Sequence, residues 1–209
     1  MKKILLSICC AFAVSATFAQ TPTVGIKGGL NLASLTSSSN TSSSSITTGT
    51  LTSFSAGIFV DFKAGSNWSV QPALLYTGKG AKESGEFDET NITIKAKINY
   101  LQLPLNFVYN VNSVAGTFYI GAGPYLGYGL SAKLEGNSNG QSESDDIGFG
   151  DGEDQYKRID AGATALIGYK FKQGVLLNLN YDLGLTDISN QSSSSTKTRV
   201  FGISVGYAF

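Results

Sequence analysis

The chain has 209 residues, 15 basic and 15 acidic, and 42% of its residues are hydrophobic while only 14% are charged. This balance excludes a disordered chain, and without a basic surplus we expect no nucleic-acid partner. The length suits one sizeable domain, and 25 glycines with 12 Phe and 10 Tyr residues favour strands and tight turns over helices.

The N-terminus is typical of a secretory signal peptide. Two lysines precede an apolar run over residues 4–14, and small residues follow up to Ala19. We expect cleavage near Ala19, so that residues 1–19 are the signal peptide and residues 20–209 form one β-barrel domain. The apolar run is too short to span a bilayer as a helix, and no later segment approaches about 20 consecutive apolar residues. The sequence therefore argues against a helical membrane protein.

Both cysteines, Cys9 and Cys10, lie inside this apolar run. Cleavage leaves a mature chain without a thiol, which excludes a disulfide or a cysteine-metal site. A lipid anchor on Cys9 is an alternative, but Ile8 is a poor neighbour for lipoprotein cleavage and the apolar run continues beyond it. Loss of Lys2 and Lys3 from the 15 basic residues leaves 13 against 15 acidic ones, so the mature chain is nearly neutral.

Alternation of apolar with small or polar residues dominates the remaining sequence, and this period of two is typical of strands. Pro72 is a mild objection to a central strand. The apolar phase reverses within the fourth segment, which predicts a bulge near Tyr100. In chain order, we expect strands at residues 24–32, 53–62, 68–79, 92–109, 118–130, 158–169, 175–182 and 201–209.

Short and long links alternate between these segments, which predicts an eight-stranded antiparallel transmembrane β-barrel with up-and-down topology. Such barrels have short periplasmic turns, longer extracellular loops and, with an even strand number, two periplasmic termini. The short links are residues 64–67, 110–116 and 171–174, and the long polar links are residues 36–50, 80–91, 133–155 and 186–197.

A secreted soluble β-sandwich or small barrel would also alternate, with its apolar face turned inward. Here the non-apolar face is mostly Gly, Ser, Thr and Asn, which would build a poor soluble core but suits a narrow lumen. Aromatic residues also gather at the strand ends near the short links, where amphipathic rings would form a membrane-interface girdle: Phe62, Trp68, Tyr109, Phe118, Tyr169, Phe171, Tyr207 and Phe209. The apolar faces are therefore expected to point outward, into lipid.

Several stretches resemble the PorT-like outer-membrane β-barrel family, the porin-family barrels of Bacteroidetes. These stretches are VGIKGGLNLA at 24–33, NYLQLPLNF at 99–107, FYIGAGPYLGYGL at 118–130, YDLGLTDI at 181–188 and the closing FGISVGYAF. The resemblance implies a Gram-negative outer-membrane location and a C-terminal strand, ending at Phe209, that the outer-membrane assembly machinery recognises. It implies little about activity, and no motif singles out the branch linked to secretion.

An enzyme is not expected. The chain has no His, the commonest general base, and no mature Cys nucleophile. A Ser or carboxylate mechanism remains conceivable, but no G-x-S-x-G motif is present. We therefore expect no catalytic residue, no metal ligand and no cofactor.

A lumen polar network is expected from five charges predicted to point inward: Lys27, Asp61, Arg158, Asp160 and Asp182. Lys27 and Asp61 flank the first long link at similar distances, which places them near the same height as a possible salt bridge. One interpretation is an ion-selecting constriction. The favoured one is a plug, because the interior of eight strands is just wide enough for side chains to fill.

The third long link is rich in carboxylates, which attract calcium, but their spacing matches no complete EF-hand. We interpret it as a solvated mobile surface loop, like the Ser-rich stretches 37–45 and 192–195. Its acidic residues are Glu135, Glu143, Asp145, Asp146, Asp151, Glu153 and Asp154.

Two functional hypotheses follow. The first is a structural or interaction barrel that displays four extracellular loops and docks an envelope protein partner. The second is a narrow porin-like channel for ions or small solutes, favoured by the small and polar lumen. A role as a secretion-associated envelope factor is a third interpretation.

Overall fold

The computed structural model describes residues 21–39, 45–87, 90–138, 141–152, 155–191 and 194–209. The predicted signal peptide, residues 1–19, lies outside the described residues. Within the described ranges, no helix has the length and apolar character needed to cross a membrane.

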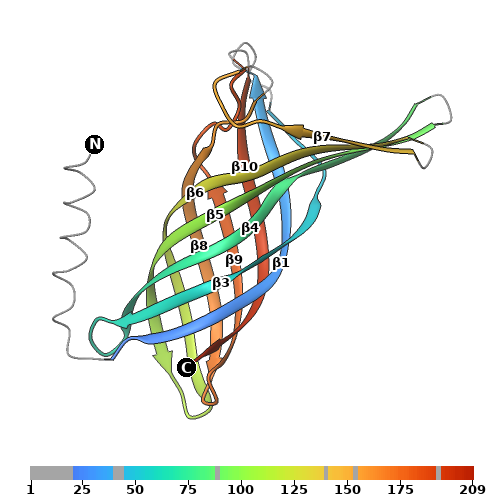
Figure 1. Ribbon diagram of the computed structural model, residues 1–209. Helices are drawn as coiled ribbons and strands as arrows, with labels where there is room; N and C mark the ends of the chain where they lie inside the picture. The colour runs from blue at the N-terminus through green and yellow to red at the C-terminus, as the bar shows by residue number, and fades with distance from the viewer. Residues whose placement is uncertain (1–20, 40–44, 88–89, 139–140, 153–154, 192–193) are drawn as a thin grey trace.

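Eight long antiparallel strands close into a ring, because β1 pairs with β3 on one side and with β10 on the other (Figure 1). Each long strand pairs with the neighbouring long strands in the sequence, which confirms the predicted up-and-down, eight-stranded barrel. Two shorter strands, β2 and β7, pair with β1 and β6. The strands are β1 Thr23–Ser39, β2 Ser45–Thr47, β3 Leu51–Lys63, β4 Trp68–Phe87, β5 Thr90–Asn112, β6 Gly116–Ser138, β7 Gln141–Ile147, β8 Ile159–Phe171, β9 Val175–Gly184 and β10 Ser194–Ala208.

The outer wall of the barrel is apolar and the inner wall is polar or small. In β5, Leu103 and Phe107 are 51% and 52% exposed, whereas Gln102 and Asn106, each one residue earlier, are both 1% exposed. The same alternation runs through every long strand. Exposed apolar side chains over the whole wall suit a lipid environment and not water.

A register shift between β5 and β6 lies where the sequence predicts a bulge, but the extra residue belongs to β6, and β5 keeps one parity because Ile98, Tyr100 and Gln102 are all buried. The shift falls between Asn99 and Tyr100, where β6 contributes the additional residue Leu130. Leu130 is 47% exposed on the outer wall, yet Ala132, two residues later, is buried inside at 3% exposure. The extra residue therefore changes which side chains of β6 face the interior beyond this point.

Two of the long links, which were expected to be surface loops, are mostly strand. β4 continues to Phe87 and β5 starts at Thr90, so residues 80–91 are mostly a hairpin. The acidic segment 133–155 is also largely sheet, because it holds the end of β6 and all of β7. β4 beyond Gly80 and β7 lack the apolar alternation of a barrel wall, so the pattern in the sequence stops there although backbone hydrogen bonding continues. Residues 92–98 of β5 do alternate, as the predicted strand 92–109 requires.

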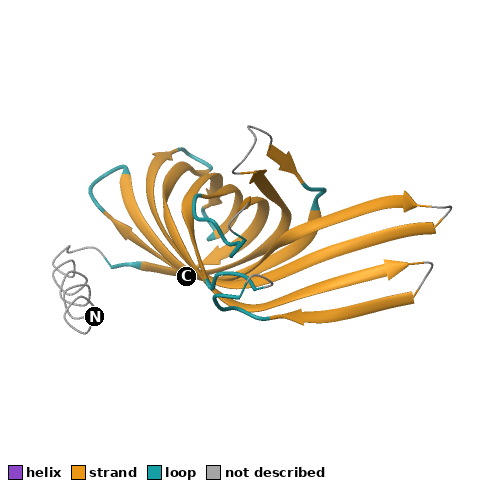
Figure 2. Cartoon of the chain, turned by 90° about the horizontal axis from the view of Figure 1, so that it is seen from above, coloured by secondary structure: helices purple, strands orange, loops and turns teal. Residues whose placement is uncertain are grey.

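The extended strands form a second feature, which we call the projecting sheet: residues 80–87 of β4, 90–99 of β5, 131–138 of β6 and all of β7. It leaves the barrel where β4 loses its ladder to β3, beyond Thr77. Gly80 follows in a left-handed conformation (φ 139°) that only glycine adopts easily. Figure 1 shows the sheet nearly edge-on beside the barrel mouth, and Figure 2 shows its strands broadside.

Aromatic side chains surround the short-turn end of the barrel, as expected from the sequence. Three edge-to-face pairs lie there: Trp68 with Tyr109, Tyr169 with Phe171, and Tyr207 with Phe209. A further set lies toward the long-loop end on the outer wall, where Phe54 stacks on Tyr76 and arginines reach the hydroxyls of Tyr128 and Tyr181. The two belts bound the apolar wall.

Candidate functional site

The interior near the long-loop end holds a fully buried ion pair. Lys79 Nζ lies 2.9 Å from Asp160 Oδ2, and both side chains have 0% exposure. β4 and β8 contribute these residues from opposite parts of the ring, so the pair crosses the lumen. A buried charge pair is tolerated only when its remaining hydrogen-bonding positions are also filled.

Hydroxyl groups supply those remaining partners. Asp160 Oδ2 also accepts hydrogen bonds from Thr198 (2.9 Å) and Tyr125 (3.3 Å), and Oδ1 accepts one from Thr186 (3.2 Å). The ammonium of Lys79 lies 4.1 Å from the centroid of the Tyr125 ring, in a cation–π contact. Asp160 thus has four hydrogen-bond partners, and the Lys79 ammonium has this carboxylate and two aromatic rings, so each charge is compensated within the lumen.

An apolar layer covers this network on the long-loop side. Residues 148–152, 155–156 and 186–191 fold across the mouth, and Asn190 Nδ2 joins two of these segments by donating to the carbonyl oxygen of Gly150 at 2.6 Å. The layer comprises Leu35, Ala81, Ile98, Tyr100, Ala132 and Ile188, with Ile147, Phe149 and Tyr156 packed against it. The described part of the mouth is therefore closed by side chains.

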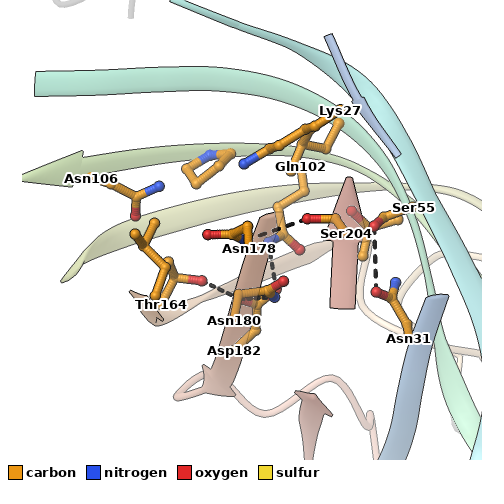
Figure 3. Close-up of a pocket in the computed structure, with 14 residues that line it drawn as sticks. Lys27, Asn31, Ser55, Gln102, Asn106, Thr164, Asn178, Asn180, Asp182 and Ser204 are labelled. Atoms are coloured by element: carbon orange, nitrogen blue, oxygen red, sulfur yellow. Dashed lines mark hydrogen bonds between the residues drawn. The ribbon is translucent and has the colours of Figure 1, made fainter. Parts of the chain in front are cut away.

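Asp182 organises a second polar cluster deeper in the barrel (Figure 3). It accepts hydrogen bonds from Thr164 and from Gln102 Nε2, the latter at 2.8 Å. Lys27 lines the same cavity, which has a volume of only about 30 Å³. A space of that size holds one or two water molecules and no larger solute.

The short-turn end is filled mainly by apolar side chains. Asp61 is buried at 7% exposure and lines a second cavity of about 20 Å³ with Lys27. Around it pack two apolar groups: Phe59, Ala73, Leu176 and Ala208 in one, and Val108, Tyr119 and Leu166 in the other. Water-sized gaps thus alternate with packed layers along the barrel axis.

Four of the five charges expected in the lumen lie along it, but they do not form one network. Asp160 and Asp182 centre separate clusters, and Lys27 lies opposite Gly57 while Asp61 lies opposite Thr23. The expectation that Lys27 and Asp61 share a height was therefore wrong by four residues. The reason is that the first long link is not shared equally between the two strands it connects. β3 starts at Leu51, opposite Ala33, whereas β1 continues past that pair to Ser39.

Arg158 does not point into the lumen, which corrects the sequence expectation. It is exposed on the rim, where its guanidinium lies 5.4 Å from the Tyr128 ring and 5.3 Å from the Phe149 ring. β8 starts one residue later, at Ile159, so the strand alternation used to orient Arg158 does not extend to it.

Sequence reasoning missed Lys79, the cationic partner of Asp160. The signal was present, because Lys79 has the same parity as the inward residues Ala73 and Thr77 in β4. Lys79 is the last residue of the predicted strand 68–79 and lies beyond Tyr76, the last apolar residue of the outer face, so it was not assigned to the lumen. Tyr125 has the same parity in β6 as Gly121 and Gly123, which marks it as an inward residue, but its hydrogen bond to Asp160 depends on the barrel radius, which the sequence does not give.

The lumen provides packing and charge neutralisation. In the described ranges, no three His, Cys, Asp or Glu side chains converge on a possible metal position. The acidic segment of β6 and β7 contributes no such cluster there. The arrangement instead fixes the strands around a plug of side chains.

Comparison with known proteins agrees with this architecture. A family model described as an outer membrane protein beta-barrel domain matches residues 18–190. No curated protein matches the chain.

Two solved structures illustrate the similarity in fold. Ail, the attachment invasion locus protein of Yersinia pestis, crystallised in complex with the heparin analogue sucrose octasulfate, is 15% identical, with a TM-score of 0.42 over 91% of this chain and 100% of that chain. Neisserial surface protein A is 12% identical, with a TM-score of 0.44 over the same shares of the two chains.

Proposed function

Because the chain belongs to the family of outer membrane protein beta-barrel domains, we propose that it is a surface-interaction barrel that does not conduct. The side-chain plug carries this proposal: the buried Lys79–Asp160 pair and the apolar layer above it block the lumen. The barrel then serves as an anchor for what it displays on the extracellular side.

The displayed element that best suits a partner is the edge of the projecting sheet. β7 pairs with β6 along one side, and within the described residues it pairs with no strand on the other. Residues 141–146 are all exposed. A free strand edge offers unpaired backbone groups to an added strand, and the acidic side chains of β7 would select a partner with basic ones. We propose that another envelope protein docks here.

Several finer assignments belong to the same proposal. The charged N-terminal residues and small residues up to Ala19 support secretion and cleavage near that residue. The five stretches of the sequence quoted above support membership of the PorT-like branch. The apolar alternation that ends at Phe209 supports recognition by the assembly machinery, and the absence of His supports a non-enzymatic role.

Planar-bilayer recording of the refolded mature chain tests the plug. We expect no reproducible unitary conductance, and a stable conductance in the wild-type protein would favour the channel hypothesis instead. Heat-modifiable gel mobility on the same sample verifies that the barrel is folded, so that an absence of conductance is not caused by misfolded protein.

Site-specific photo-crosslinking in cells tests the partner. A crosslinker placed at Ser142 or Ser144 of β7 is expected to give a discrete protein adduct. The same crosslinker at the exposed Val114, in a short turn at the opposite end, is the matched control. Adducts of the same size from both positions, or from neither, would contradict docking at β7.

A further inference from the structure

The projecting sheet carries a basic side that the proposed partner does not use. Lys82, Lys95, Lys97 and Lys133 lie on one face of it, as their cross-strand register requires. The ion pair between Lys97 and Glu135 (2.6 Å) and that between Lys133 and Asp146 (3.2 Å) confirm that these strands present the same face. We call this surface the lysine face.

The opposite face has a different chemistry. It presents Glu83, Glu143 and Asp145 around the exposed apolar side chains Ile94 and Leu134. Among the described side chains, the lysine face combines four ammonium groups with two carboxylates, while the other face has carboxylates alone. The sheet therefore separates charge between its two sides.

Two pairs of lysines lie directly opposite each other on the lysine face. Lys82 faces Lys95 across β4 and β5, and Lys97 faces Lys133 across β5 and β6. Like charges in directly opposed positions destabilise a sheet. Lys97 and Lys133 have carboxylate partners, but Lys82 and Lys95 form no ion pair with any described residue. An anion from outside the sheet would relieve this repulsion.

The barrel determines where the lysine face points. In β5, Lys97 and Lys95 continue the parity of the outward residues Leu103 and Leu101, so the lysine face extends the lipid-facing wall. Figures 1 and 2 show that the sheet bends away from the barrel and lies across its axis. When the part of a barrel wall above the membrane bends away from the barrel axis, its lipid-facing side turns down toward the membrane surface. The lysines therefore face the surface of the outer leaflet.

We propose that the lysine face binds anionic phosphate headgroups of lipids in the outer leaflet around the barrel. The ammonium groups act as point charges that donate hydrogen bonds to phosphate oxygens, and their aliphatic stems lie over the lipid surface. The sheet is thereby held against the membrane, with the apolar and acidic face turned to the exterior. This proposal rests on the family's membrane location and is independent of a partner at β7.

Lysine labelling in nanodiscs tests this placement. The refolded mature chain is incorporated in phosphatidylcholine alone or mixed with phosphatidic acid, then acetylated and analysed by mass spectrometry. Lys157, which lies just before β8 at the mouth of the barrel, is the matched internal control. Its side chain is 45% exposed, close to the 42% of Lys97 and the 50% of Lys133. We expect several-fold slower acetylation of the four lysines than of Lys157 in the anionic bilayer only. The difference should shrink at 1 M salt, where the screening length falls to about 3 Å.

Three outcomes would overturn the proposal. Equal acetylation rates in both bilayers would mean that the face does not contact the headgroups. Equal slowing at Lys157 would indicate a general bilayer effect. Protection by inorganic phosphate in phosphatidylcholine nanodiscs would identify free phosphate, and not lipid, as the ligand.

A double variant gives an independent readout. Lys82→Gln with Lys95→Gln removes the two lysines without ion pairs, so the sheet keeps its described ion pairs and loses one repulsion. Native mass spectrometry is expected to show weaker phosphatidic acid retention, by about fivefold for each lysine removed. Lys157→Gln with Lys172→Gln removes the same charge elsewhere and should retain the lipid. Equal retention by both variants would contradict the proposal, and crosslinking from β7 reports the partner separately.

Discussion

Three strands, β4, β5 and β6, contribute to both the barrel and the projecting sheet, yet opposite rules govern the two regions. Inside the ring, the charged groups that centre the polar clusters are buried and their partners are fixed, as at Asp160, which accepts four hydrogen bonds. On the sheet, the charged groups are exposed and pair loosely. In the barrel, the membrane selects apolar residues for one face of a strand, and packing in the lumen selects the residues of the other face. In the projecting sheet neither constraint acts, so the same strands form a rigid plug in one region and an adaptable surface in the other.

The largest expected effect comes from breaking the buried ion pair. Asp160→Ala leaves Lys79 charged and unpaired in the lumen, and we expect a loss of about 3–5 kcal/mol in the free energy of unfolding. Urea unfolding of the barrel in lipid vesicles, followed by tryptophan fluorescence, measures it. The double variant Lys79→Met with Asp160→Leu should recover most of the loss; equal destabilisation in both variants would show that packing, not the unpaired charge, is responsible.

A matched pair of isoleucines in β5 tests the contrast between the two regions directly. Ile98 is fully buried in the apolar layer, whereas Ile94, four residues earlier and of the same parity, is 46% exposed. We expect Ile98→Ala to cost about 2–5 kcal/mol and Ile94→Ala to cost about 0.5 kcal/mol or less. Similar costs in the same unfolding assay would mean that the projecting sheet has a packed face in the membrane.

Tyr100 offers a smaller effect of the opposite sign. Its hydroxyl is buried and no described residue forms a hydrogen bond with it. Because an unsatisfied buried polar group destabilises, Tyr100→Phe should leave stability unchanged or raise it by up to about 1 kcal/mol. Tyr125→Phe is the control, since it loses the hydrogen bond to Asp160 and should destabilise. A stability loss in Tyr100→Phe would reveal a partner for its hydroxyl.

The weakest effect concerns an exposed carboxylate on the projecting sheet. The hydrogen bond from Lys97, with the charges of Lys97, Lys95 and Lys133, lowers the pKa of Glu135. Its small contribution to stability is therefore present above the unfolded-state pKa of about 4.3 and is lost as the pH falls through the lower folded-state pKa. Carboxyl carbon chemical shifts measured during a pH titration should show this lowered value, and Lys97→Gln should raise it. A pKa that does not respond to that substitution would exclude the pair in solution.

The sequence predicted the barrel well because lipid imposes a readable pattern. Alternation in residues such as Leu103 and Phe107 located the strands and oriented them. The phase reversal before Leu101 marks where the apolar residues of β5 change from the outer wall to the buried layer that contains Ile98, while the bulge itself lies in β6. Apart from residues 92–99, the projecting sheet was mistaken for loops, because QSESDDI in β7 is polar on both faces and has no alternation to detect. The height of Lys27 relative to Asp61 was not predictable, since it depends on how the chain of the first link is divided between two strands.

The extra residue of β6 has a consequence for how such proteins tolerate changes in length. Leu130 sits where the barrel gives way to the projecting sheet, and the β6 residues beyond it are set one position out of phase by it. A deletion of this single codon would preserve every hydrogen-bonded strand and the composition of the surface. Lys133 and Leu134 would keep their present faces, because Gly129 and Ser131 would then lie opposite Tyr100 and Asn99 in a regular ladder. The bulge is therefore a position at which β6 can lose one residue without reversing its outward face.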